Sequence, residues 1–299
     1  MVHPTRRVKT LLTWLVLVTI FLVRFFYGYN IPLSGDEAGV GLLQATGNWS
    51  AYQEGLPVYE VTTLDQIRAY LTSNPGSTAS EVIRTMRDDQ LHPPLYFVML
   101  HFVVDWFGNS ASLLRGLSVF LSVLSVVAAY RLGKELYGER AGVVGAMMVA
   151  LSPYCLEYSI MVRLYPLAML LALLSSWLVI RLVRSGEFSL RNQVLYYYIL
   201  VSVAGLYTYY SFGFLLVSHL VFIILVKRPG FRDLLIIIGV YLVIGLLLIP
   251  WILPMLQGVG SVQDKDYYFK GTYTLSELAH YFRSALFLPF RNGWGPEAN

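Results

Sequence analysis

Long apolar stretches separated by short polar segments run along most of the chain. Seven of them are long enough, or nearly so, to cross a bilayer as a helix of about 20 residues that satisfies its own backbone hydrogen bonds. They are residues 10–29, 112–132, 141–158, 164–183, 194–210, 212–226 and 233–253. An eighth stretch, residues 94–107, has only 14 residues and suits an interfacial or re-entrant helix. The pattern predicts an all-α polytopic membrane protein with about seven transmembrane helices.

The positions of lysine and arginine support leaving residues 94–107 out of the crossing count. With seven crossings, every short segment on one side carries three basic residues, as the cytoplasmic side of a membrane protein does. These residues are Arg6, Arg7, Lys9, Arg131, Lys134, Arg140, Arg181, Arg184, Arg191, Lys227, Arg228 and Arg232. The N-terminus is then cytoplasmic, residues 30–111 form a large first external loop with interfacial helices, and residues 254–299 form a second external segment. Arg24, near the outer end of the first stretch, is expected to snorkel to the interface.

Composition narrows the function classes. Of the 299 residues, 56% are hydrophobic and 13% are charged, which excludes a conventional cytosolic enzyme. The single cysteine, Cys155, excludes an intramolecular disulfide and a cysteine-rich metal site. The net charge of +4 is explained by the cytoplasmic segments, so we expect membrane lipids and not nucleic acid as partners.

The first candidate site is the acidic pair Asp36 and Glu37, directly outside the first apolar stretch. Ser34 and Glu37 have capping-box spacing, and the helix dipole favours ionised carboxylates in a first helical turn. A well-capped helix start is therefore one interpretation of the pair. The other is a general base held at the membrane surface, where it would meet a lipid-linked substrate.

The second and third candidate sites carry groups that could bind a phosphate. His92 precedes two prolines, which can simply begin a helix, but an imidazole at the membrane edge can also bond a phosphate or a hydroxyl. Arg163 and Tyr165 follow a Ser-Pro-Tyr segment, and Arg115 begins the second span. An arginine at such a boundary is either a headgroup anchor or a bidentate phosphate ligand that stabilises a leaving group. The sequence contains no local metal, P-loop or dinucleotide motif, so we expect no metal site or cofactor, with participation of a divalent cation left open.

The order of these motifs resembles the GT-C superfamily of membrane glycosyltransferases over roughly residues 8–255. The resemblance rests on the Asp36-Glu37 pair, then HPPLYF, ASLLRGLSVF, YRLGKELYGERAG, SPY and Arg163-Leu164-Tyr165. Within that superfamily the chain is similar to the dolichyl-phosphate-mannose-protein mannosyltransferase family, which includes the bacterial aminoarabinose transferases. The resemblance implies one GT-C-like transmembrane domain over residues 1–299 that is C-terminally incomplete relative to the family.

The resemblance also implies an activity. It is the inverting transfer of a sugar from a polyprenyl-phosphate donor to a lipid, glycan or protein hydroxyl at the external face of a prokaryotic cell (inner) membrane. Asp36 would be the base, Glu37 would orient the acceptor or support the base, and Arg163 would bind the donor phosphate. His92, Tyr165 and Arg115 would assist in binding. Two alternatives stay open, namely a transporter or flippase of a lipid-linked substrate and a non-catalytic assembly partner.

Overall fold

The computed structural model describes residues 6–29, 31–55, 63–71, 78–89, 92–186 and 188–264, and within these ranges it contains helices and no strand. This confirms the predicted all-α class. The elements are α1 (Arg6–Tyr29), η1 (Glu37–Leu43), α2 (Trp49–Gly55), α3 (Leu64–Tyr70), α4 (Ala79–Asp89), α5 (Leu95–Phe107), α6 (Ala111–Tyr137), α7 (Glu139–Leu151), α8 (Pro153–Ser159), α9 (Tyr165–Arg184), α10 (Gln193–Leu206), α11 (Phe212–Lys227) and α12 (Phe231–Asp264). Most of the predicted external segment 254–299, from residue 265 onward, lies outside the described residues.

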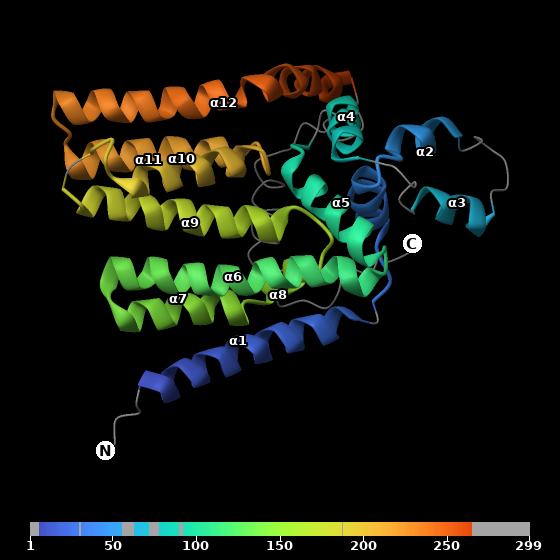
Figure 1. Ribbon diagram of the computed structural model, residues 1–299, viewed down its shortest axis with the longest axis horizontal. Helices are drawn as coiled ribbons and strands as arrows, with labels where there is room; N and C mark the ends of the chain where they lie inside the picture. The colour runs from blue at the N-terminus through green and yellow to red at the C-terminus, as the bar shows by residue number, and fades with distance from the viewer. Residues whose placement is uncertain are drawn as a thin grey trace, which may run out of the picture.

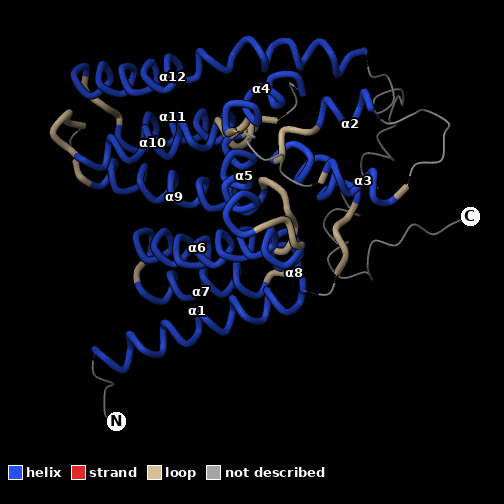
Figure 2. The backbone as a smooth tube through the Cα atoms, turned by 45° about the vertical axis from the view of Figure 1, so that its right-hand side comes forward, coloured by secondary structure: helices blue, strands red, loops and turns tan. Residues whose placement is uncertain are grey.

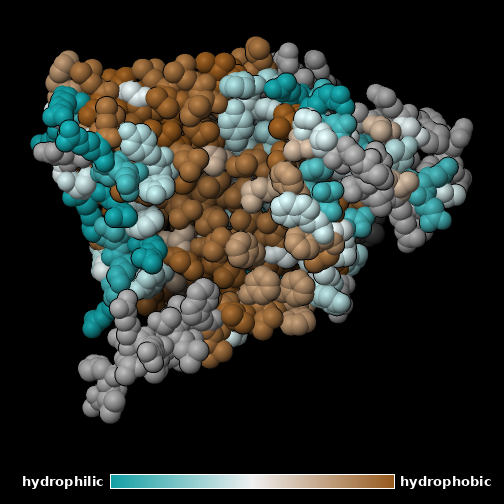
Figure 3. Space-filling view, in the orientation of Figure 1, coloured by the Kyte–Doolittle hydropathy of each residue, from teal (hydrophilic) through white to brown (hydrophobic). Residues whose placement is uncertain are grey.

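The long helices lie side by side in a bundle, and the short helices gather at one end of it (Figures 1 and 2). Helix α6 packs against α1, α7 and α9, while α10 packs against α9, α11 and α12. The turns α6–α7, α9–α10 and α11–α12 lie together at the opposite end, on the left of Figure 1. That end is hydrophilic in Figure 3, and a broad apolar band separates it from the end that carries α2 to α5. The basic residues at the ends of α6, α9 and α11, and in the segments that follow these helices, therefore share one end of the bundle.

Helix length and composition bear on the number of membrane crossings. Three described helices are long and apolar enough to span a bilayer, namely Ala111–Tyr137, Tyr165–Arg184 and Phe231–Pro254. A bent pair, Glu139–Leu151 with Pro153–Ser159, raises the number to four. The stretches Leu15–Tyr29, Gln193–Leu206 and Phe212–Lys227 are apolar but shorter, as is α5. The count of seven stays a prediction.

The stretch 141–158, expected to be one continuous span, is broken at Ser152. Helices α7 and α8 meet at an angle of 60°. The residue before a proline is pushed out of the helical region, and Ser152 has φ −62° and ψ 124°. Its Oγ then accepts a hydrogen bond from the N–H of Cys155, and Pro153 occupies the first turn of the new helix. The break turns α8 away from the axis of α7.

Arg24 stabilises that break, and the expectation that it snorkels to the interface is wrong. Its side chain is buried, and Nη2 donates to the carbonyls of Val149, at 2.9 Å, and Ala150, at 3.0 Å. Pro153 has no N–H with which to bond the Val149 carbonyl four residues earlier. Arg24 supplies the missing donor at the negative end of the α7 dipole and so joins α1 to α7.

A chain of hydrogen bonds joins the four helices α9 to α12 inside the bundle. Tyr241 OH donates to the Leu216 carbonyl at 2.8 Å, so it accepts at 3.1 Å from Tyr198 OH. Because Tyr198 has only one hydroxyl hydrogen, it accepts from Nδ1 of His219 at 3.3 Å. A neutral His219 with its proton on Nδ1 then accepts at Nε2 from Ser176 Oγ, at 3.1 Å. Each member of the chain thus has a partner on another helix.

Candidate active site

The segment after α1 forms the predicted helix cap. The N–H of Ser34 donates to Oε2 of Glu37 at 2.8 Å, and the N–H of Glu37 donates to Oγ of Ser34 at 3.2 Å. These reciprocal bonds are a capping box, which confirms the structural interpretation of this spacing. Asp36 lies at the N-cap of η1, a π-helix over Glu37–Leu43. Such helical bulges are frequent at functional sites.

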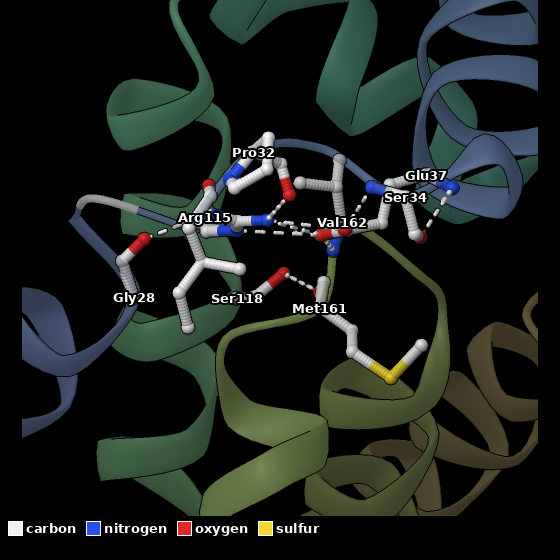
Figure 4. A network of polar contacts seen from close by, with 9 residues as sticks. Gly28, Pro32, Ser34, Glu37, Arg115, Ser118, Met161 and Val162 are labelled. Atoms are coloured by element: carbon white, nitrogen blue, oxygen red, sulfur yellow. Dashed lines mark hydrogen bonds and ion pairs between the residues drawn. The ribbon is translucent and has the colours of Figure 1, made fainter. Parts of the chain in front are cut away.

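Glu37 forms a buried ion pair with Arg115 of α6. Nη2 of Arg115 lies 3.1 Å from Oε2 of Glu37, and Nε lies 3.3 Å from Oε1. The same guanidinium donates to the carbonyl oxygens of Gly28, Ile31 and Pro32 (Figure 4). All three guanidinium nitrogens are therefore bound within the protein, and they tie the end of α1 and the start of η1 to α6.

The charge of Glu37 follows from these contacts. Burial alone would raise the pKa of this carboxyl, but hydrogen bonds from Ser34, Arg115 and the N–H of Val162 outweigh it, as does the positive charge of Arg115. The net effect is a pKa below the ordinary value. Glu37 is thus an ionised carboxylate whose acceptor positions are used inside the protein.

Glu37 also holds the segment that carries Arg163. Oε1 of Glu37 accepts the N–H of Val162 at 3.0 Å, and Ser118 Oγ of α6 donates to the Met161 carbonyl at 2.6 Å (Figure 4). The backbone of η1 approaches closely, since a Cβ at Gly41 would lie 2.7 Å from the Val162 carbonyl oxygen. The segment between α8 and α9 is therefore fixed from η1 and α6.

Arg163 is buried, but its hydrogen-bonding capacity is not used up. The side chain is 7% exposed, and among the described residues Nε and Nη1 have no hydrogen-bond partner. Nη1 lies 3.9 Å from Oδ2 of Asp36, whose side chain is 64% exposed. The guanidinium also lies 5.8 Å from the centre of the Tyr165 ring. A buried cation with free donors thus faces an exposed carboxylate, an arrangement suited to binding an anion next to a base.

A pocket of about 290 Å³ begins next to Arg163, at Tyr165. It is lined by Ser122, Tyr154, Cys155, Tyr158, Ser159, Tyr165, Pro166, Met169 and Tyr209. The ring centres of Tyr154 and Tyr158 lie 4.5 Å apart, and those of Tyr158 and Tyr165 lie 4.9 Å apart. Aromatic faces with hydroxyl tips can contact both apolar and hydroxyl-bearing groups.

One known protein family matches this part of the molecule. The family model described as dolichyl-phosphate-mannose-protein mannosyltransferase matches residues 91–255, more than half of the 299-residue chain. The chain belongs to the dolichyl-phosphate-mannose-protein mannosyltransferase family. It is therefore an integral membrane protein of a glycosyltransferase family, which implies a glycosyl donor and an acceptor at the membrane. Comparisons with curated proteins and with solved structures found no match.

The family match and the geometry cover different parts of the site. His92, Arg115, Arg163 and Tyr165 lie within the matched residues, whereas Asp36 and Glu37 precede them. The fold nevertheless brings Asp36 to Arg163 and Glu37 to Arg115. His92 lies half-buried before α5, with its ring 6.0 Å from that of Phe97. Its part in substrate binding stays a prediction.

Two features of the site were not predicted from the sequence. The tyrosines Tyr154, Tyr158 and Tyr209 join Tyr165 in the pocket, and the first two stand within ten residues of Arg163, which was the available signal. The contact of Ser118 with Met161 had no local signal, because 43 residues separate the two. Within the described ranges no group of three or more His, Cys, Asp or Glu side chains gathers to hold a metal ion. Participation of a divalent cation stays a prediction.

Proposed function

We propose that this protein transfers a sugar, with inversion, from a polyprenyl-phosphate donor to a hydroxyl of a lipid, glycan or protein acceptor. One observation carries the proposal: the buried guanidinium of Arg163 has two nitrogens without a hydrogen-bond partner among the described residues, and it lies 3.9 Å from the exposed carboxylate of Asp36. The family membership supports a glycosyltransferase in general terms. The polyprenyl-phosphate donor, the direction of transfer and the roles of the residues are part of the proposal.

Arg163 is proposed to bind the phosphate of the donor. A phosphate oxygen would occupy the free donors of the guanidinium in charge-assisted hydrogen bonds. As the bond between the anomeric carbon and the phosphate oxygen breaks, the departing phosphate gains negative charge, which a fixed and largely dry cation stabilises. The lipid or the sugar of that donor would then reach the pocket that Tyr165 lines.

Asp36 is proposed to be the base. Its exposed carboxylate can take the proton of the acceptor hydroxyl while the hydroxyl oxygen forms a bond to the anomeric carbon. The phosphate leaves on the opposite face with the electron pair of the broken bond, so the anomeric configuration inverts in one displacement. Glu37 and Arg115 are proposed to position the two segments, because their polar atoms already bond within the protein.

The site is proposed to lie at the external face. It lies at the end of the bundle opposite to the α6–α7, α9–α10 and α11–α12 turns (Figure 1). Arg131 and Lys134 lie near the end of α6, Arg140 lies at the start of α7, and Arg181, Arg184 and Lys227 lie near the ends of α9 and α11. Cytoplasmic segments are the ones rich in lysine and arginine, so the positive-inside rule puts the site outside. In this orientation the N-terminus would be cytoplasmic. The membrane is proposed to be a prokaryotic inner membrane.

The test is incubation of membranes that contain the protein with a panel of polyprenyl-phosphate sugars, followed by mass analysis of lipid and protein acceptors. Wild type should give a glycosylated product, and Asp36→Asn should give none at equal membrane insertion. Asp105→Asn, an exposed acid on α5, is the matched control and should retain transfer. Movement of a lipid-linked sugar across the membrane without product would favour the flippase. Transfer only after a second chain is added would favour the assembly partner.

A further inference from the structure

The turn that leads into Arg163 is held through a single carbonyl oxygen. The Met161 carbonyl accepts the N–H of Arg163 at 2.9 Å and, on its other lone pair, Oγ of Ser118 at 2.6 Å. The first bond closes a three-residue turn over residues 161–163. The second bond connects that turn to Ser118, in the N-terminal half of α6. The backbone from which the Arg163 side chain projects is thereby anchored to a long helix.

A second hydroxyl completes the anchor. Tyr96 OH of α5 lies 3.4 Å from Ser118 Oγ, and both side chains are fully buried. The only hydroxyl hydrogen of Ser118 goes to Met161, so Tyr96 is the donor to Ser118. Burial raises the pKa of Tyr96, which keeps that donor protonated. A directed chain therefore runs from Tyr96 on α5, through Ser118 on α6, to the turn of Arg163.

We propose that Ser118 is a positioning residue for donor binding, which acts by fixing the turn that aims Arg163. This inference rests on the proposed function of Arg163. In the part of the chain that the structure describes, Nε and Nη1 of the buried guanidinium have no hydrogen-bond partner, and the ion pair of Nη1 with Asp36 is long, at 3.9 Å. The orientation of the Arg163 side chain is consequently set by its backbone, and the hydrogen bond from Ser118 to Met161 connects that backbone to α6. Tyr96 supports Ser118 in the same role.

The experiment measures KM for a polyprenyl-phosphate sugar, kcat and thermal stability in detergent for Ser118→Ala. The matched control is Ser125→Ala, because Ser125 is also a fully buried serine of α6 but donates to Leu121 within its own helix. Loss of one hydrogen bond predicts a roughly threefold to tenfold rise in KM for Ser118→Ala, with a smaller change in kcat. Ser125→Ala should leave KM unchanged.

Two further variants keep the test decisive. Ser118→Ala leaves the buried Tyr96 hydroxyl without its acceptor, so the double variant Tyr96→Phe/Ser118→Ala should show the same rise in KM if the single variant does not fold. In an Arg163→Lys background, where the lysine keeps a positive charge for the donor phosphate, Ser118→Ala should raise KM by a smaller factor than in wild type. A merely structural role of Ser118 would not change with the side chain at position 163.

The outcomes separate this inference from the proposed function. If Arg163→Ala impairs donor use but Ser118→Ala and the double variant match Ser125→Ala, the positioning role is wrong and the role of Arg163 stands. If Arg163→Ala leaves donor use unchanged, the proposed function of Arg163 fails, and the positioning role fails with it. Equal rises in KM for Ser118→Ala with arginine or lysine at position 163 would also overturn the inference.

Discussion

Glu37 and Arg115 form an ion pair in which both side chains are at most 5% exposed and the shortest N–O distance is 3.1 Å. The pair joins the end of α1, the start of η1 and the segment 160–164 to α6 (Figure 4). Glu37 is next to Asp36 in sequence, yet the two carboxylates have different surroundings. Glu37 is enclosed by hydrogen-bond donors, while Asp36 is 64% exposed and meets Arg163. The carboxylate of Glu37 thus holds the segments of the site together, and the carboxylate of Asp36 is accessible to a substrate.

Removing the charge of Glu37 is expected to destabilise the fold. Glu37→Gln leaves Arg115 buried without a counter-ion, which costs roughly 3–5 kcal/mol. The measurement is the free energy of unfolding in detergent. Glu81→Gln is the matched control, because Glu81 accepts the N–H of Thr78 in a capping arrangement at the exposed start of α4, and this variant should lose about 1 kcal/mol or less. Equal losses in the two variants would show that the ion pair adds nothing to the cap.

The same pair predicts how stability depends on pH. The folded-state pKa of Glu37 is lowered from its ordinary value of 4.5, so its stabilising contribution is complete above that value. It is lost as the pH falls through the lowered pKa, when the folded carboxylate takes up a proton. The free energy of unfolding of wild type, which exceeds that of Glu37→Gln at neutral pH, should therefore approach that of the variant on acidification below pH 4.5. An advantage that persists unchanged to pH 2 would contradict this assignment.

The close approach of η1 to the segment 160–164 predicts an effect of a single methyl group. A Cβ at Gly41 would lie 2.7 Å from the carbonyl oxygen of Val162. This oxygen belongs to the backbone, so it cannot move aside as the end of a flexible side chain can. Gly41→Ala should therefore impair transfer, although alanine favours a helix by about 1 kcal/mol over glycine. Gly39→Ala is the control, since its Cβ would meet only the Trp49 ring at 3.9 Å. If both variants transfer sugar at the wild-type rate, η1 does not set the site.

The hydrogen-bond chain through His219 predicts energetic coupling between helices. His219→Leu and Tyr198→Phe each break the bond of 3.3 Å between these side chains, so together they should cost less than the sum of the single losses. The expected coupling is about 0.6 kcal/mol, typical of hydrogen bonds between membrane helices. Ser218→Ala serves as the control with Tyr198→Phe, because Ser218 bonds within its own helix. Strict additivity of His219→Leu and Tyr198→Phe would refute the chain.

Sequence reasoning predicted features that depend on local chemistry. The long apolar stretches predicted the helices, and the spacing of Ser34 and Glu37 predicted the cap, because both features depend on neighbouring residues. Proline at position 153 carried the signal for the break at Ser152, but a long apolar stretch masked it. The partner of Arg24 is 125 residues away and depends on that break, so snorkelling was the natural and wrong expectation.

The long-range contacts of the site were beyond the reach of the sequence. The pairing of Arg115 with Glu37 spans 78 residues and distinguishes a buried structural arginine from Arg163, whose Nε and Nη1 have no hydrogen-bond partner among the described residues. Both arginines stand at apolar boundaries in the sequence and look alike there. Only the packing of α6 against the segment 160–164 separates their surroundings. The same packing selects Asp36, and not Glu37, as the exposed carboxylate.

The central claim is that Arg163 binds the donor phosphate and Asp36 accepts the acceptor proton. Its most direct test compares binding of a polyprenyl phosphate with sugar transfer for two purified variants. Asp36→Asn should bind the polyprenyl phosphate at least as tightly as wild type but transfer no sugar. Arg163→Ala should lose binding and transfer together, at nearly wild-type stability. Wild-type binding by Arg163→Ala, or full transfer by Asp36→Asn, would contradict the account.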